Sequence, residues 1–326
     1  SPERELYKKH PDWVIKAPER DLVLGRGGTQ VVLDLGNPQV QDFVFNVVDE
    51  LMTNYPEIDY IKWDANMSIL NHGSNNLGKD EQSHLYIAYH RGLENVCKRI
   101  RMKYPELTMQ ACASGGGRAN YGVLAGFDEF WVSDNTDALQ RIYMQWGTSY
   151  FFPSIAMASH VSASPNHQTG RRVPLKFRFD VAMMGRLGME MQPSSMTEQE
   201  QVFSKKAIET YKHIRPIVQL GDLYRLISPY DNKGVASLMY VAPEKEHAVF
   251  FGYKLVHFIN QQIPRFRMAG LDPMKNYRFT ELNLPIGEEP CSLHGKVISG
   301  QILMENGVEI SLRNEYASRV FELSVE

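Results

Sequence analysis

The chain has 326 residues, of which 43% are hydrophobic and 22% are charged, a composition typical of a folded globular protein. Its 35 basic and 38 acidic residues give a net charge of -3, without the basic excess that binding to nucleic acid phosphates requires. Charged residues, glycine or proline interrupt every apolar run before it reaches the roughly 20 residues of a membrane span. We therefore expect a soluble protein that binds neither nucleic acid nor a membrane.

The chain contains three cysteines, Cys97, Cys112 and Cys291. They are too few and too scattered for a disulfide framework or a CxxC zinc site, which favours a reducing compartment. The sequence starts at Ser1 with neither an initiator Met nor the charged and then apolar pattern of a secretory leader, so it does not reveal whether a targeting segment was removed. We predict a cytoplasmic location, with the periplasm as the alternative.

The predicted elements alternate along the first two thirds of the chain. The first 30 residues are rich in Pro, Gly and charged residues, which predicts an irregular segment. After a predicted strand at 31–35, Asn37 and Pro38 form the start signal of a helix. Hydrophobic periodicity then predicts strands at 58–64, 107–112, 129–132 and 154–161, and helices at 38–55, 82–103, 138–150 and 197–213.

Strands that alternate with helices indicate a parallel sheet, and polar residues after four of the strands are typical of the active face of a (β/α)8 TIM barrel. From about residue 220, the short apolar runs 235–241, 248–253 and 308–312 are typical of an antiparallel β-sandwich. We predict an α/β barrel domain at 1–220 and a β-sandwich domain at 221–326. The first domain supplies five or six βα units instead of eight, so either the barrel is incomplete or the sheet is open.

Three polar residues of one strand face the same way. In an extended strand Lys62, Asp64 and Asn66 point to one side and Trp63 to the other. A lysine beside an aspartate favours the ionised carboxylate, which can act as a nucleophile. The alternative is a structural ion pair at a strand end.

A second carboxylate, Asp134, follows another predicted strand and lies beside Asn135, Thr136 and Asp137. Two strand-end aspartates, one ionised and one protonated, are what glycoside hydrolysis requires. Asp, Asn and Thr are also favoured helix N-caps. Asp134 and Asp137 are each candidates for such a cap.

A glycine-rich turn lies between these two motifs. Gly115, Gly116 and Gly117 allow the backbone to approach a ligand closely, but the Gly-Lys-Ser/Thr ending of a phosphate-binding loop is missing. Cys112 lacks a His base in the sequence pattern, so we interpret this segment, up to Arg118, as a wall of the site.

His160, His167 and Arg171 follow the next strand. A His-x6-His spacing is not a standard zinc pattern and no third ligand is in register. We expect these residues to make structural hydrogen bonds rather than to bind a metal.

Taken together, the motifs resemble those of glycoside hydrolase family 36, the microbial α-galactosidases. Four of them occur in the order of that family, and the similarity runs from Leu6 to Arg225. They are Lys62-Trp63-Asp64-x-Asn66, Cys112-x-Ser114-Gly115-Gly116-Gly117-Arg118, Trp131-x-Ser133-Asp134-Asn135-Thr136-Asp137 and the segment His160 to Arg171.

The resemblance implies a retaining α-galactosidase without a cofactor or metal, which hydrolyses terminal α-1,6-linked galactose in substrates such as melibiose and raffinose. It implies that Asp64 is the nucleophile and Asp134 the general acid/base, with carboxyl groups about 5 to 5.5 Å apart. It further implies a homo-oligomer, with a tetramer as one form. The implied substrate-binding residues are Lys62, Asn66, Cys112, Ser114, Gly115, Gly116, Arg118 and Trp131.

The chain departs from the family in what precedes Leu6. Family members carry a β-sandwich and three barrel strands there, so the resemblance implies the C-terminal part of such an enzyme. Two open sheet edges would then be exposed, and we expect the chain alone to be inactive. The alternatives are an α-N-acetylgalactosaminidase, a galactosyl transferase like raffinose synthase, a non-catalytic sugar-binding remnant and, least favoured, a phosphate-binding enzyme.

Overall fold

The computed structural model describes residues 1–231, 233–260 and 262–326. The chain consists of two compact units, residues 1–131 (unit 1) and residues 132–326 (unit 2). This division concerns packing, and the domain boundary predicted near residue 220 stays a prediction. Among the described residues, no helix is both long enough and apolar enough to cross a membrane.

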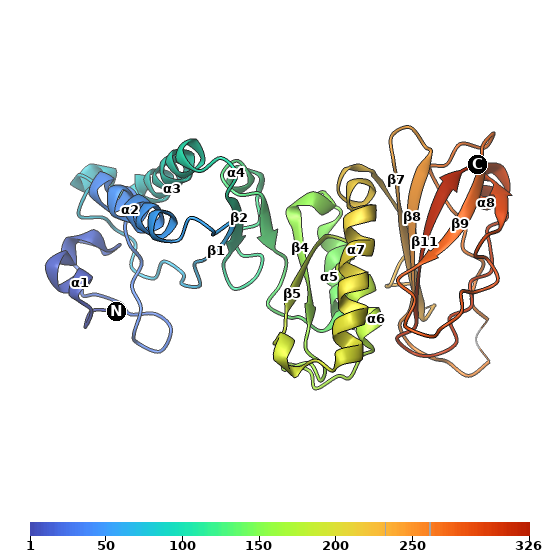
Figure 1. Ribbon diagram of the computed structural model, residues 1–326. Coiled ribbons are helices and arrows are strands. Elements are labelled where there is room, and N and C mark those ends of the chain that lie inside the picture. The colour runs from blue at the N-terminus through green and yellow to red at the C-terminus, as the bar shows by residue number, and fades with distance from the viewer. Residues whose placement is uncertain (232, 261) are drawn as a thin grey trace. The chain divides into compact units, whose positions relative to one another are not determined.

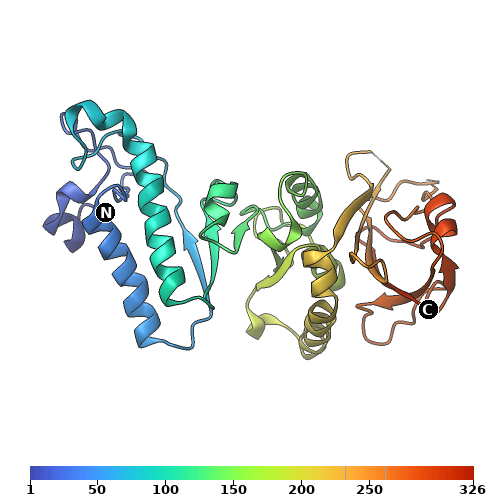
Figure 2. The same cartoon turned by 90° about the horizontal axis from the view of Figure 1, so that it is seen from above.

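Unit 1 contains a short parallel sheet and two long helices. Strand β1 pairs in parallel with β2, and β2 pairs in parallel with β3. The helices α2 and α3 run side by side, as the blue and teal ribbons in Figure 2 show. The elements are α1 (Glu5–Lys9), η1 (Pro11–Trp13), α2 (Pro38–Asn54), β1 (Tyr60–Asp64), η2 (Lys79–His84), α3 (Leu85–Lys103), β2 (Thr108–Cys112), α4 (Tyr121–Leu124) and β3 (Glu129–Trp131).

The two long helices begin and pack as their residues dictate. Helix α2 starts where Asn37 accepts a hydrogen bond from the Gln39 N–H, with proline at the first helical position. Helix α3 lies so close to the segment that precedes α2 that a Cβ atom on Gly92 would be 1.7 Å from the Leu35 carbonyl oxygen. Only glycine fits there, because any side chain would overlap the backbone.

Two sequence predictions for unit 1 are wrong. Residues 5–9 form a helix inside the segment predicted to be irregular. The strand predicted at 31–35 is not part of the sheet, because its backbone bonds to residues near Trp13 instead. Leu33 forms an isolated bridge with Val14, and the Asp34 N–H donates to the Trp13 carbonyl over 2.8 Å. The predicted strands at 58–64, 107–112 and 129–132 are confirmed as β1, β2 and β3.

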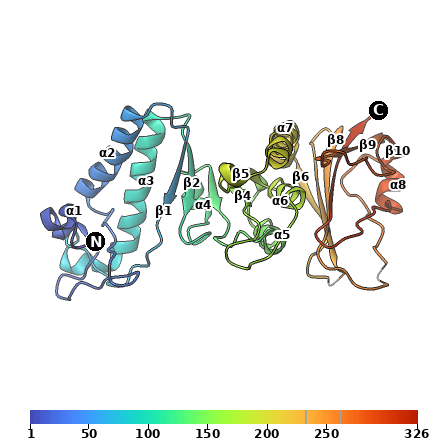
Figure 3. The ribbon, with the colours of Figure 1, turned by 60° about the horizontal axis from the view of Figure 1, so that its bottom comes forward.

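Unit 2 combines a parallel strand pair with a six-stranded antiparallel sheet of order β10-β9-β11-β8-β7-β6. Strands β4 and β5 are parallel, and helices α5, α6 and α7 lie beside them (Figures 1 and 3). The elements are α5 (Ala138–Thr148), η3 (Ser154–Ala156), β4 (Met157–Ser162), α6 (Leu175–Ala182), β5 (Arg186–Glu190), η4 (Pro193–Ser195), α7 (Glu198–Leu220), β6 (Asp222–Ile227), β7 (Val235–Val241), β8 (His247–Lys254), β9 (Asn276–Leu282), β10 (Val297–Ser299), α8 (Gly300–Glu305) and β11 (Ser318–Val325).

The central strands of the antiparallel sheet are buried on both faces. On one face, side chains such as Tyr240 and Phe251 pack with residues of α6 and α7. On the other face, Phe250 packs with α8 and with irregular segments. The strand predicted at 308–312 is wrong, because only Val308 forms a bridge, with Phe266. Its apolar side chains are buried against the sheet without a ladder of backbone hydrogen bonds.

A buried carboxylate ties α6 to the antiparallel sheet. Asp180 is fully buried and accepts hydrogen bonds from Lys176 Nζ at 2.5 Å, Asn283 Nδ2 at 2.6 Å and Ser318 Oγ at 2.6 Å. A buried charge requires such partners, since leaving it unpaired costs several kcal/mol. Lys176 lies in α6 itself, so the contacts with Asn283 and Ser318 are those that fix α6 against the sheet.

Candidate active site

The exposed face of β1 carries the first group of predicted site residues. Lys62 and Asp64 are exposed, while Trp63 lies on the opposite side of the strand and packs against Phe127 with ring centroids 5.9 Å apart. Lys62 Nζ lies 4.8 Å from the centroid of the Trp131 ring, within the range of a cation–π interaction. The lysine is thus held over the aromatic ring at the end of β3.

A chain of hydrogen bonds orients the Asp64 carboxylate. Asn66 Nδ2 donates to Asp64 Oδ2, and the Ser114 N–H donates to Asn66 Oδ1 over 2.6 Å. Ser114 and Gly115 have φ angles of 48° and 83°, a left-handed turn that glycine adopts without strain. The turn after β2 therefore fixes the amide that holds the carboxylate.

Cys112 pairs in register with Asp64 and is buried. The pKa of the Cys112 thiol is raised to about 11, mainly by burial and also by a hydrogen bond with Asp64, while the Gly115 backbone and Lys62 act in the opposite direction. The thiolate is the nucleophilic form of cysteine. At neutral pH the Cys112 thiol is therefore protonated, which does not suit a nucleophile, and its predicted role in the wall of the site stays a prediction.

Arg118 connects the ends of two strands. Its guanidinium donates to the Trp63 carbonyl over 2.8 Å and to the Cys112 carbonyl over 3.1 Å, and burial lowers the pKa of this group. Gly116 forms an isolated bridge with Ala113 in the same turn. Arg118 holds the turn together, and its predicted role in sugar binding stays a prediction.

A pocket of about 580 Å³ lies along β1. Lys62, Trp63, Asp64 and Asn66 line one part of it, and mostly apolar side chains of α2 and of residues 30–35 line much of the rest. The motif of β1 thus faces a space large enough for a small ligand.

Asp134 lies in unit 2, in the irregular segment 133–137 that leads into α5. The N-cap of α5 is Asp137, whose side chain accepts from the Gln140 N–H over 3.1 Å. The cap interpretation therefore applies to Asp137. Asp134 is exposed, and the predicted distance between its carboxyl group and that of Asp64 stays a prediction.

Side chains from three places hold the segment 133–137. From α5, Arg141 donates to the Ser133 carbonyl over 3.1 Å. From the end of β4, Ser162 donates to the Thr136 carbonyl over 2.7 Å. From the following loop, Asn166 Nδ2 donates to the Thr136 hydroxyl over 3.0 Å. The backbone that carries Asp134 is therefore fixed on several sides.

The predicted group His160, His167 and Arg171 does not form one cluster. His160 Nδ1 lies 3.6 Å from Glu190 Oε2 on β5, whereas Arg171 Nε lies 2.8 Å from Asp137 Oδ2 and His167 is exposed. Within residues 1–231, 233–260 and 262–326, no group of three or more His, Cys, Asp or Glu side chains is placed to hold a metal.

The polar residues of this loop were missed by the sequence reasoning. Asn166 Oδ1 accepts from the N–H groups of Gln168 and Thr169, and the Thr169 hydroxyl donates to Asp137 Oδ2 over 2.5 Å. The Asn-x-x-Thr pattern from Asn166 to Thr169, which includes His167, is a turn signal. That signal predicts a folded loop but not which carboxylate it contacts.

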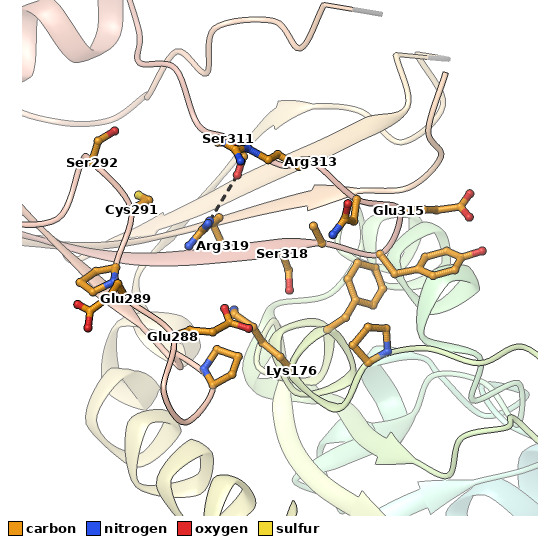
Figure 4. Close-up of a pocket in the computed structure, with 17 residues that line it drawn as sticks. Lys176, Glu288, Glu289, Cys291, Ser292, Ser311, Arg313, Glu315, Ser318 and Arg319 are labelled. Atoms are coloured by element: carbon orange, nitrogen blue, oxygen red, sulfur yellow. Dashed lines mark hydrogen bonds between the residues drawn. The ribbon is translucent and has the colours of Figure 1, made fainter. Parts of the chain in front are cut away.

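A second pocket, of about 610 Å³, lies where α6 meets the loops around the antiparallel sheet. Figure 4 shows its charged lining, with Lys176 below and Arg313 and Arg319 above. It contains none of the predicted site residues. The motifs, rather than the volume of a cavity, therefore place the candidate site along β1 and at the segment 133–137.

Two family models match the chain, one in its first two thirds and one in its last third. Residues 1–221 match the model described as melibiase, and residues 235–323 match that of the glycosyl hydrolase family 36 C-terminal domain. The chain belongs to glycoside hydrolase family 36. The family predicted from the four motifs is confirmed.

Curated relatives of this family-36 chain are named as α-galactosidases. The chain is 37% identical over 289 residues to α-galactosidase AgaA of Geobacillus stearothermophilus, which covers 89% of this chain and 39% of the relative. It is 36% identical over 321 residues to probable α-galactosidase G of Emericella nidulans, covering 98% of this chain and 41% of the relative. The chain thus spans about two fifths of the length of these relatives.

Solved family-36 structures match the whole chain. A variant of AgaA in complex with 1-deoxygalactonojirimycin aligns with a TM-score of 0.90 and 34% identity, over 100% of this chain and 43% of that one. Another AgaA variant, in complex with raffinose, aligns with a TM-score of 0.89. These matches confirm the predicted fold class, a partial TIM barrel followed by an antiparallel β domain.

Proposed function

We propose that this chain forms the reacting part of a retaining α-galactosidase that hydrolyses terminal α-1,6-linked galactose from substrates of the melibiose and raffinose type. The names of its relatives support this, as does the relative solved with raffinose. The observation that carries the proposal is the link from Ser114 through Asn66 to Asp64. It holds an exposed carboxylate in one orientation at the end of a strand, as a nucleophile requires.

The proposed reaction has two steps. In the first, an oxygen of Asp64 bonds to the anomeric carbon while the glycosidic bond breaks, and Asp134 donates its proton to the leaving oxygen. In the second, Asp134 takes a proton from water, the water oxygen attacks the anomeric carbon, and the bond to Asp64 breaks. Each step inverts the anomeric carbon, so the product retains its configuration, with carboxyl groups about 5 to 5.5 Å apart.

The remaining predicted residues bind or enclose the sugar in this proposal. Lys62 and Asn66 bind galactose hydroxyls, and Trp131 shapes the pocket while it holds the lysine. The neutral Cys112 thiol does not compete with Asp64 for the anomeric carbon. Ser114, Gly115, Gly116 and Arg118 form and support the turn at the wall. The two carboxylates supply the nucleophile and the proton, so the reaction needs no cofactor.

The proposal is tested with melibiose and the intact natural protein that contains this chain. We expect NMR to detect α-galactose as the first product, and we expect Asp64→Asn and Asp134→Asn to lower turnover by at least about 10²-fold, since acid–base catalysis alone contributes about 10² to 10⁴. β-Galactose as first product, or faster hydrolysis of the N-acetylgalactosaminide, would contradict the proposal.

The chain by itself is expected to be inactive. Strand β1 lies at one end of its sheet in the described part of the chain, so the pocket beside Asp64 is open on that side. Incubation of the pure chain with nitrophenyl α-galactoside is expected to release no nitrophenol above the buffer control. Robust hydrolysis would show that the chain needs no further part.

The proposed assembly follows from the family resemblance, and the proposed location follows from the three scattered cysteines, which favour a reducing compartment. We propose a cytoplasmic homo-oligomer, with a tetramer as one form. Sedimentation of the intact protein tests the assembly, and a single monomeric species at micromolar concentration would contradict it.

A further inference from the structure

A chain of contacts runs from Tyr316, next to β11 of the antiparallel sheet, through Arg171 to Asp137, in the segment that carries Asp134. This link has no role in the function derived above. We propose that Tyr316 positions Asp134 through Arg171 and Asp137. This inference rests on the proposed function, because it takes Asp134 as the general acid/base. Tyr316, Arg171 and Asp137 are positioning residues, and none of them is placed against the substrate.

The first contact of the link joins the antiparallel domain to the loop after β4. Arg171 Nη1 donates to the Tyr316 hydroxyl over 2.7 Å, and the guanidinium carbon lies 5.7 Å from the centroid of the same ring. The Tyr316 ring also packs edge-on against Phe177 of α6, with centroids 5.8 Å apart. Tyr316 therefore restricts both the position and the orientation of the arginine fork.

The backbone of Tyr316 indicates that its position is imposed by the surrounding structure. Its φ angle is 58°, in the left-handed region where a bulky residue other than glycine is strained by about 1 to 2 kcal/mol. Its N–H donates to the Lys254 carbonyl over 3.0 Å, which holds this conformation at the end of β8. Strain of this kind is retained where a structure needs one particular side-chain direction.

The second contact joins Arg171 to the cap of α5. Arg171 Nε donates to Asp137 Oδ2 over 2.8 Å, and the Asp137 side chain is fully buried. The other oxygen of the same carboxylate, Oδ1, accepts from the Gln140 N–H as the cap of α5. Because both oxygens belong to one rigid group, fixing Oδ2 also fixes the cap.

The charge of Asp137 makes the arginine necessary. Burial raises the pKa of Asp137, but hydrogen bonds from Thr169, from the Gln140 N–H and from Arg171 outweigh it and lower the pKa overall. The group is therefore an ionised, buried carboxylate at neutral pH. Without the held arginine it would lose its cation, and it would move outward or take up a proton.

Asp134 lies three residues before Asp137 in the same held segment. A general acid works only within about 2.6 to 3.2 Å of the oxygen it protonates. Movement of the segment by about 1 Å can cost as much as about 10²-fold in rate. The antiparallel domain thus contributes to the accuracy of protonation without touching the sugar.

Two measurements test the link, and Tyr253→Phe is the matched control. Tyr253 packs on the same Phe177 ring, with centroids 5.8 Å apart, and its hydroxyl donates to the Asp180 carbonyl, away from Asp137. In the chain itself, Tyr316→Phe and Arg171→Lys are expected to raise amide hydrogen exchange at Gln140 and Arg141, the amides that Asp137 holds. Tyr253→Phe is expected to leave exchange at these amides unchanged.

The second measurement uses leaving groups in the intact protein. Melibiose needs its leaving oxygen protonated, whereas a dinitrophenyl α-galactoside does not. We expect Tyr316→Phe to lower kcat/KM about tenfold on melibiose and less than about twofold on the activated substrate, within the range that a general acid contributes. A structural defect would lower both values equally.

Unchanged exchange in both variants, an equal loss on the two substrates, or the same result for Tyr253→Phe would overturn the inference. A wild-type protein that hydrolyses neither substrate would overturn the proposed function instead, and the exchange measurement would still decide whether the link holds the cap of α5.

Discussion

The two units hold their candidate carboxylates by different means. Asp64 ends a strand whose backbone is fixed by a parallel ladder, and the neighbouring Asn66 side chain orients it. Asp134 lies in an irregular segment that side chains of α5, β4 and the following loop hold in place. Backbone ladders satisfy their own polar groups, whereas an irregular segment needs buried polar side chains to do so. The site in unit 2 therefore depends on more residues that are distant in sequence.

The largest expected effect tests the buried polar contacts of unit 2. Asp180→Ala removes the partner of Lys176, Asn283 and Ser318 and is expected to lower the free energy of unfolding by about 3 to 5 kcal/mol, the cost of breaking a buried pair. Urea denaturation of the wild-type chain and of the variant measures this difference in the free energy of unfolding.

The matched control for Asp180→Ala is Glu209→Ala, which removes an exposed ion pair with Lys212 within α7. Such pairs contribute about 0 to 1 kcal/mol. Similar losses in the two variants would mean that the contacts of Asp180 are no stronger than surface pairs.

The next effect tests the close packing of unit 1. Gly92→Ala would place a Cβ atom 1.7 Å from the Leu35 carbonyl, and the forced shift of α3 is expected to cost about 1 to 3 kcal/mol. The control is Gly147→Ala in α5, where an added Cβ meets no atom within 4 Å. There, alanine is expected to stabilise the helix by up to about 1 kcal/mol. Thermal unfolding of both variants shows whether each substitution raises or lowers stability. An equal loss of stability in the two variants would contradict the packing argument.

A third prediction compares the two sites directly in the intact protein. Asn66→Ala removes the side chain that donates a hydrogen bond to Asp64 Oδ2 and is expected to lower kcat on melibiose about tenfold, because a small misplacement of a reacting group is costly. Ser162→Ala removes one of several contacts to the segment 133–137 and is expected to lower kcat less than about twofold. A larger loss of kcat in Ser162→Ala than in Asn66→Ala would mean that the contacts to the segment 133–137 are not redundant.

The smallest expected effect concerns pH. Hydrogen bonds lower the pKa of Asp137 below its ordinary value of 3.8 despite burial, so the charged group stabilises the fold above that pH and this contribution is lost as the pH falls through the lowered pKa. The difference in the free energy of unfolding between wild type and Asp137→Asn should therefore narrow as the pH falls below 3.8, as urea denaturation at several pH values would measure. A constant difference would mean that Asp137 does not titrate on unfolding.

The sequence predicts those features that arise from local patterns. Apolar runs predict β1, β2 and β3, and Asn37 followed by proline predicts the start of α2. The capping box of Thr197 and Glu200 predicts the start of α7, although this helix continues through Pro216 to Leu220 rather than ending near His213. Helix α6 was missed because it is short and buried on nearly all sides, so it has no hydrophobic stripe to detect.

The contacts of the site were less predictable than its motifs. The spacing places Lys62, Asp64 and Asn66 on one side of β1, and the structure agrees, since Lys62 and Asp64 are the more exposed residues of the strand's end and Asn66 bonds to Asp64. No local pattern predicts that Arg118 holds two carbonyl groups or that Arg171 contacts Tyr316, 145 residues away. Such contacts depend on tertiary packing, which periodicity does not encode.

The left-handed backbone at Tyr316 has a consequence for engineering. Glycine or asparagine at this position would relieve the torsional strain, so a screen for heat resistance would favour these residues. Either substitution would also remove the hydroxyl that holds Arg171. A screen for turnover would favour tyrosine. The two selections are expected to diverge here, as stability and activity often do.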